Sequence, residues 1–229
     1  EALAALSEVL EAPEVIYGRS KSADMQFEPV RDSTGRELPN SFALYEEKYE
    51  SCPDTELRRD AFASFTKTLR QYKHTFAAIY GTEVKKQVIL AKMRGYSSVT
   101  EMLLQPQHVT LEMYHNLHDI IQKELAPHMR RLARLKKRVL GLDQVRFCDL
   151  KAPLDPDFQP ATTYEQASEM ILESLAILGE EYTDVIRKAL TDRWVDRANN
   201  VGKATGAFCS SPYGVHPLIL ITWTDHLRS

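Results

Sequence analysis

Only a few residues of this chain stand at spacings that could carry chemistry. Glu112 and His115 form a Glu-x-x-His pair, and Asp119 lies one helical turn further, so one helix face could hold a metal ion. A two-metal site in a helical bundle needs two such pairs plus further carboxylates, and the sequence contains only one such pair. We therefore favour exposed polar side chains as the interpretation, and we assign no metal ligand in this chain.

Cys209 is the candidate nucleophile, because a thiolate is the reactive form of cysteine. Lys203 is the one cation near it in the sequence, and no base is evident, so a buried packing thiol is favoured. The other cysteines are Cys52 and Cys148. Three widely spaced cysteines argue against a disulfide framework and against a cysteine-rich zinc site. This usage predicts a reducing, cytoplasmic setting.

A dense basic run lies between Arg130 and Arg138, where six of nine residues are Lys or Arg. Such a run could bind phosphates. However, the chain has a net charge of -3, and no aromatic residue interrupts the run, so a solvated helix face is favoured and no nucleic-acid partner is predicted. The longest strongly apolar run, residues 218–223, is far shorter than the ~20 residues of a membrane span, so no membrane partner is predicted.

The catalytic motifs that can be recognised from sequence are missing. The chain contains no His-Glu-x-x-His, no P-loop, no Gly-x-Ser-x-Gly and no dinucleotide-binding fingerprint. We therefore assign no catalytic residue within residues 1–229.

The segment that could position a ligand is the last part of the chain, residues 199–229, which predicts two short strands joined by a turn. Gly206–Cys209 is small and apolar, and Leu218–Trp223 is an apolar run. An exposed strand edge has free N–H and C=O groups and can add an extended peptide as a further strand. The alternative is that this strand is paired on both sides within a sheet, and the spacing alone leaves the two open.

The rest of the chain predicts helices, with one small hairpin at about residues 25–38 around the turn Asp32–Gly35. A long helix is expected from the cap Asp54 to Gly95, and another from the cap Thr110 to Gly141, kinked at Pro127. A capping box at Thr162–Glu165 predicts the start of a later helix. The residues expected to face inward are Phe62, Phe65, Leu69, Tyr72, Phe76, Ile79, Tyr80, Val84, Val88 and Met93 in the first helix and Leu111, Tyr114, Leu117, Ile121, Leu125, Leu132, Leu135 and Val139 in the second.

The order of several short motifs resembles one family of zinc peptidases. The end of the chain is similar to the segment Asn-x-Gly-Lys-x-x-Gly-Ala-Phe/Tyr-Cys of the oligoendopeptidase F branch of the thimet-oligopeptidase-like zinc peptidases. The matching residues there are Asn200, Gly202, Lys203, Gly206, Ala207, Phe208 and Cys209. Upstream, motifs follow in family order at Ser22–Asp24, Phe27, Val30, Asp32, Arg59–Phe62, Leu69, Val84–Lys85, Arg94–Ser97, Leu140–Leu142, Asp149–Leu150 and Leu178–Tyr182.

This resemblance implies a mainly α fold, a multi-helix zincin-type peptidase segment with a small antiparallel hairpin near the C-terminus. Residues 1–198 would form a helical channel wall, and residues 199–229 would form a β-hairpin leading toward a zinc-binding helix beyond Ser229. Zinc would belong to the full-length protein, with its His-Glu-x-x-His ligands outside this sequence.

The function implied is that of the upstream portion of a cytoplasmic zinc metalloendopeptidase, an oligopeptidase that hydrolyses short peptides. Its partners would be the peptide substrate and the C-terminal catalytic part of the same protein. The residues implied to bind substrate are Gly206, Ala207, Phe208 and Cys209. The alternative is a non-catalytic helical module that binds proteins or peptides.

Overall fold

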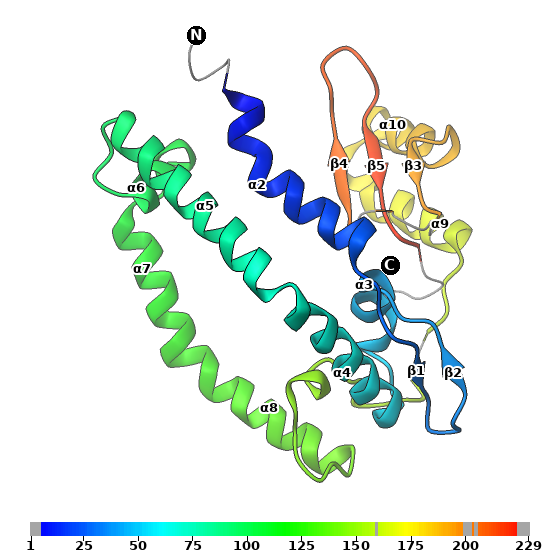
Figure 1. Cartoon of the computed structure of the whole chain (residues 1–229). Helices are drawn as coiled ribbons and strands as arrows, with labels where there is room; N and C mark the ends of the chain where they lie inside the picture. The colour runs from blue at the N-terminus through cyan, green and yellow to red at the C-terminus, as the bar shows by residue number, and fades with distance from the viewer. Residues whose placement is uncertain (1–5, 159, 199–202, 204–205, 224–229) are drawn as a thin grey trace. The chain divides into compact units, whose positions relative to one another are not determined.

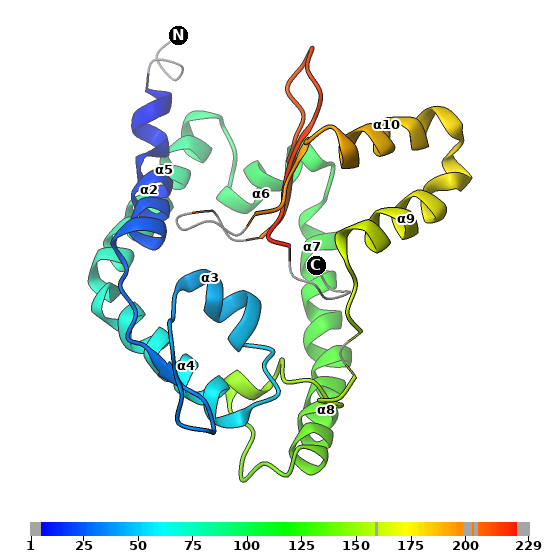
Figure 2. The same ribbon diagram turned by 90° about the vertical axis from the view of Figure 1, so that its right-hand side faces the viewer.

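The computed structural model describes residues 6–158, 160–198, 203 and 206–223, which are mainly helical and carry two small sheets (Figures 1 and 2). The mainly α fold class predicted from the sequence is confirmed. The chain divides into two compact units, Glu1–Leu154 and Asp155–Ser229. The sequence-based division into a channel wall (residues 1–198) and a terminal hairpin (residues 199–229) follows the implied roles of these segments, and it stays a prediction.

The first unit contains most of the helices. They are α2 (Ser7–Arg19), α3 (Phe42–Leu44), α4 (Thr55–Gln71), α5 (Lys73–Met93), α6 (Val99–Leu104), α7 (Leu111–Ile120) and α8 (Ala126–Val139). Short π-helical turns follow α2, α3 and α7 at Ser20–Asp24, Tyr45–Tyr49 and Ile121–Leu125. Short 3-10 turns lie at Gln105–Gln107 and Phe147–Asp149.

The hairpin predicted at residues 25–38 is present and is shorter than expected. Its strands are β1 (Val30–Arg31) and β2 (Glu37–Leu38), which pair antiparallel with Val30 opposite Leu38. The Asp32 carboxylate accepts hydrogen bonds from the Thr34 and Arg36 amides at 3.0 Å and thereby closes the turn.

The core of the first unit lies between this hairpin and α4. Asp54 caps α4 as predicted, since its carboxylate accepts from the amides of Glu56 and Leu57. The core residues on α4 recur at helical spacing, and the rings of Tyr45 and Phe65 stack with their centroids 4.1 Å apart. The buried residues of this cluster are Val30, Tyr45, Tyr49, Leu57, Ala61 and Phe65.

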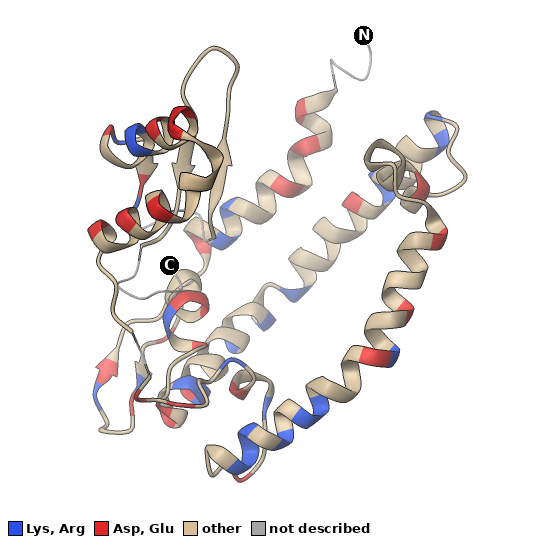
Figure 3. Ribbon diagram, turned by 180° about the vertical axis from the view of Figure 1, so that it is seen from behind, with Lys and Arg blue, Asp and Glu red and all other residues tan. Residues whose placement is uncertain are grey.

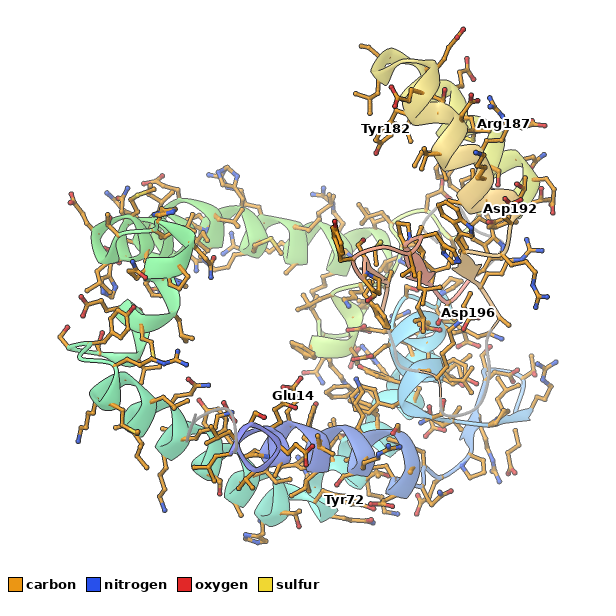
Figure 4. The ribbon with its side chains drawn as sticks, turned by 90° about the horizontal axis from the view of Figure 1, so that it is seen from above. Glu14, Tyr72, Tyr182, Arg187, Asp192 and Asp196 are labelled. Atoms are coloured by element: carbon orange, nitrogen blue, oxygen red, sulfur yellow. The ribbon has the colours of Figure 1, made fainter. Side chains whose placement is uncertain are left out.

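The long helix expected from Asp54 to Gly95 is broken at Tyr72, which lies between α4 and α5 (Figure 4). The prediction that its apolar stripe is buried throughout was wrong for α5, where Tyr80 is 72% exposed and Met93 is 65% exposed. Apolar residues are spread around α5 rather than gathered on one side, so packing against α2 leaves many of them uncovered. Val84 and Val88 are exposed for the same reason.

The second long helix is present as α7 and α8, with Thr110 accepting from the Met113 amide at its start. Pro127 interrupts it as predicted. Proline has no backbone N–H to donate within the helix, and the π-helical turn just before α8 accommodates this change in the hydrogen bonding. Gly141 follows its end with φ 62°. The prediction of an inward apolar face was wrong for most of its residues, because within the described part of the first unit they remain accessible to solvent; those exposed are Leu111, Leu117, Ile121, Leu125, Leu132 and Val139.

A buried ion pair ties α4 to the 3-10 turn that follows α8. The Arg58 guanidinium donates to the Asp149 carboxylate at 2.8 Å, and both side chains are fully buried. Arg59 donates to the same carboxylate at 3.2 Å and to Asp143 at 2.8 Å. Burial alone would raise the pKa of Asp149, but hydrogen bonds from the Arg146 amide and the two guanidinium groups hold it below its ordinary value.

The second unit joins two helices to a three-stranded sheet. The helices are α9 (Tyr164–Leu175) and α10 (Glu180–Thr191), linked by the 3-10 turn Ala176–Leu178 (Figure 2). The capping box of α9 is present one residue later than predicted, with Thr163 and Gln166 bonded to each other's backbone. The strands are β3 (Val195–Asp196), β4 (Phe208–Ser210) and β5 (Leu218–Leu220).

Candidate functional site

The candidate peptide-binding strand, β4, lies at an edge of the second sheet. The strand order is β3-β5-β4, with β5 in the middle (Figure 1). β4 pairs antiparallel with β5, with Cys209 opposite Ile219, so the predicted terminal hairpin is confirmed. Among the described residues β4 has no pairing partner on its other side. We call that side the open edge of β4.

The register shows which backbone groups of β4 face the open edge. The Ile219 amide donates to the Trp194 carbonyl at 2.8 Å, so Ile219 presents its backbone groups to β3. Backbone direction alternates along a strand, so its neighbours Leu218 and Leu220 present theirs to β4. Their partners Ser210 and Phe208 therefore bond to β5. It follows that the N–H and C=O of Cys209, which lies between them, point to the open edge.

The side chains of β4 are accessible as well. Phe208 is 52% exposed, and Gly206, Ala207 and Cys209 are all exposed. The prediction of a buried thiol at Cys209 was wrong, because the side chain of Cys209 is exposed on an edge strand of the second unit. The thiol lies 3.7 Å from the Ser211 hydroxyl.

Lys203, the cation considered as a partner for Cys209, is committed elsewhere. Its side chain is 6% exposed, and its ammonium donates to the carbonyls of Ala198 at 2.7 Å and Ile221 at 2.8 Å. It also reaches the carbonyl and the carboxylate of Asp196, at 3.0 and 3.1 Å. Because its donors are occupied by these oxygens, Lys203 is a backbone anchor rather than an activator of the thiol.

The returning half of the hairpin is held by a tight turn and an aromatic contact. Gly214 has φ 84° in the turn Pro212–Val215, a conformation that suits glycine. The ring of His216 stacks on Trp194, which precedes β3, with the ring centroids 4.6 Å apart. His216 is therefore a packing residue. The matched residues Asn200 and Gly202 lie outside the described residues.

A hollow of about 390 Å³ lies on the β3 side of this sheet. It is bounded by the start of α9, the end of α10 and β3, and its lining includes Tyr164, Arg193 and Asp196, the last of which is labelled in Figure 4. The Arg197 guanidinium sits 4.1 Å from the centre of the Tyr164 ring. No residue of β4 lines this hollow. Any binding of a peptide to β4 would therefore use the open edge of that strand.

Among the described residues, the fold brings no further metal-ligating side chain to the possible metal-binding face of α7. Glu112, His115 and Asp119 are all exposed, and the rings of Tyr114 and His118 pack edge to face at 4.5 Å. In the part of the chain that the structure describes, no three His, Cys, Asp or Glu side chains are grouped as metal ligands. The described residues therefore do not fit a zinc site.

The basic run falls on α8, where Lys and Arg residues gather toward its end (Figure 3). Lys136 departs from the expected solvated face. It is buried, and its ammonium donates to the carbonyls of Leu150 and Ala152 at 2.5 and 2.6 Å.

The described helices include none that is both long and apolar enough to span a membrane. The three cysteines all carry free thiols.

Comparison with known proteins gives close sequence relatives. The family model described as peptidase family M3 matches residues 48–228. Oligopeptidase PepF of Bacillus subtilis is 37% identical, with 99% of this chain and 34% of the relative covered. Group B oligopeptidase PepB of Streptococcus agalactiae is 31% identical, with 99% and 37% covered. The chain thus spans about a third of the length of these relatives.

Solved structures agree with this result. The crystal structure of oligoendopeptidase-F from Enterococcus faecium has a TM-score of 0.64 and 28% identity, covering 82% of this chain and 35% of that one. PZ peptidase A with inhibitor 2 has a TM-score of 0.77 over 96% of this chain and 39% of that one, and at 19% identity it shows the fold alone. With the family model matching most of its length, this chain belongs to peptidase family M3.

Proposed function

We propose that this chain is the upstream portion of a zinc metalloendopeptidase that hydrolyses peptide bonds in short peptides. The observation that carries the proposal is the open edge of β4 in a chain that belongs to a peptidase family. Extended peptides bind to such edges through their backbones, which suits an enzyme that accepts many sequences. The names of the relatives, which are oligopeptidases, support the same substrate class.

Gly206, Ala207, Phe208 and Cys209 are the substrate-binding residues in this proposal. The Cys209 N–H and C=O would pair with a peptide that lies alongside β4 and add it to the sheet. The exposed Phe208 side chain would contact substrate side chains. Residues 1–198 would contribute helices to the wall of a substrate channel, and residues 199–229 would lead toward the catalytic part.

Zinc is the cofactor that the family resemblance implies. In this proposal its ligands would lie in a C-terminal catalytic part of the protein, as the family resemblance implies. That part is also the proposed intramolecular partner of this chain. We assign no catalytic step to any residue here, and the chain's own role is to bind and orient the peptide. The free thiols are consistent with a cytoplasmic location.

The second candidate is a non-catalytic helical module that binds proteins or peptides. The exposed apolar residues of α5, α7 and α8 favour a role in interaction. The two readings differ in one respect, which is whether the full-length protein carries a His-Glu-x-x-His beyond this segment and cleaves peptides.

The chain of residues 1–229 by itself is expected to show no peptide hydrolysis in the presence of zinc, because it lacks the motif that holds and uses the metal. The measurement is cleavage of an internally quenched oligopeptide, with the full-length protein as the positive control. Zinc-dependent turnover by residues 1–229 would falsify the assignment of the catalytic residues to the other part. A full-length protein that is inactive with zinc would instead support the interaction module.

A further inference from the structure

Lys203 holds together parts of the second sheet that are distant in the chain. Its ammonium lies within 3.1 Å of four oxygens, more than its three protons can serve at full strength. Two of them are carbonyls of Asp196 and Ala198, at and just beyond the end of β3, and a third is the carbonyl of Ile221, just beyond β5. The charge is thus stabilised mainly by backbone dipoles, and the parallel pair β3–β5 is clamped at its C-terminal end.

The position of Lys203 in the chain gives this clamp a second effect. β3 and β4 lie on opposite sides of β5 (Figure 1), and the connection between them along the chain is residues 197–207. Lys203 is in that connection, and its anchor lies at the end of β3 and just beyond the end of β5. Only residues 204–207 then separate the anchored point from the start of β4 at Phe208. A short tether limits where β4 can begin and so limits its displacement along β5.

We propose that Lys203 is a positioning residue for peptide binding, which fixes β4 against β5 so that the Cys209 N–H and C=O meet the substrate backbone in one register. This inference rests on the proposed function of β4. Lys203 acts through the strand and not on the substrate, since its ammonium is nearly buried and directed at protein oxygens. Loss of the anchor loosens the open edge, and a looser edge binds peptide less well because ordering it then costs free energy on binding.

The test uses the full-length protein with three variants. Lys203→Met keeps the length of the side chain and removes the ammonium. Asp196→Asn removes the exposed carboxylate and leaves the three carbonyl partners of Lys203 in place. Lys188→Met is the matched control, because Lys188 is exposed on α10 of the same unit and makes no described side-chain contact.

Two measurements distinguish the structural role of Lys203 from its effect on peptide binding. Hydrogen exchange at the amides of Phe208 and Ser210 reports the β4–β5 pairing without any need for activity. The kinetic constants for an internally quenched oligopeptide report peptide binding. For Lys203→Met we expect exchange at these amides to be at least about tenfold faster and KM to rise about tenfold, with kcat changed less than about threefold. Asp196→Asn and Lys188→Met should stay within about twofold of wild type in both readouts.

Each outcome decides a separate point. Unchanged exchange at Phe208 and Ser210 in Lys203→Met overturns the anchor. Faster exchange with an unchanged KM overturns the role in peptide binding and leaves Lys203 a purely structural residue. An Asp196→Asn variant as impaired as Lys203→Met assigns the effect to the carboxylate pair and overturns the backbone anchor. A wild-type protein that leaves the peptide intact rejects the proposed function, whereas the exchange readout still decides the anchor.

Discussion

Replacing Cys209 by proline in the full-length enzyme is expected to lower kcat/KM for an oligopeptide by about tenfold to a hundredfold, because the substrate loses a backbone hydrogen bond. The Cys209 amide points to the open edge, so proline removes the donor that an added peptide strand would use. The ring also occupies the space that the peptide carbonyl would enter. A buried carbonyl left without its partner costs about 1–3 kcal/mol, which corresponds to this range.

The same substitution should leave the sheet largely intact. Proline is tolerated on edge strands when its missing N–H faces outward, and the bonds of Phe208 and Ser210 to β5 remain. Cys209→Ala is the matched control, since it removes the thiol and keeps the amide. We expect its kcat/KM to stay within about threefold of wild type, because the proposal assigns binding to the backbone. Equal losses in the two variants would assign the effect to the thiol and contradict the proposal.

The largest expected effect on stability is at the buried ion pair of the first unit. Asp149→Asn should lower the free energy of unfolding of residues 1–229 by about 3–5 kcal/mol, measured by urea denaturation, because it leaves the buried Arg58 charge without a counter-charge. The control is Asp143→Asn. Asp143 pairs with Arg59 at the surface with its side chain 59% exposed, so we expect a much smaller loss of stability than for Asp149→Asn.

The pH dependence of this contribution has a definite sign. The pKa of Asp149 in the folded protein is below its ordinary value, so the folded state favours the ionised carboxylate. Its contribution to stability is complete above the unfolded-state pKa of about 3.9 and is lost as the pH falls through the folded-state pKa. The stability difference between wild type and Asp149→Asn should therefore shrink in acid. A difference that stays constant as the pH falls would mean that Asp149 is not ionised in the folded state.

The local elements could be predicted because their signals are local. Asp54 and Thr110 precede apolar residues at helical spacing, and both cap helices. The terminal hairpin follows from two apolar segments with a turn between them. β3 was missed because Val195–Asp196 has no alternating pattern, and its parallel pairing with β5 depends on the tertiary fold.

The periodicity of apolar residues does not predict which element, if any, packs against an apolar face. The periodicity predicts buried apolar positions on α5, α7 and α8, but it identifies an apolar face without identifying the element that would cover it. The apolar neighbours of Cys209 likewise predict a buried thiol, because they do not indicate that the strand lies at an edge of the sheet. The pair of Arg58 and Asp149 joins residues 91 positions apart, and no local signal connects them.

The open edge of β4 is tested most directly by a crystal structure of the full-length protein with a non-cleavable peptide bound. We expect the peptide to lie extended beside β4, with its backbone paired to the Cys209 N–H and C=O at about 2.7–3.2 Å between nitrogen and oxygen. A further strand of the protein itself paired along this edge, or a peptide bound away from β4, would contradict the account.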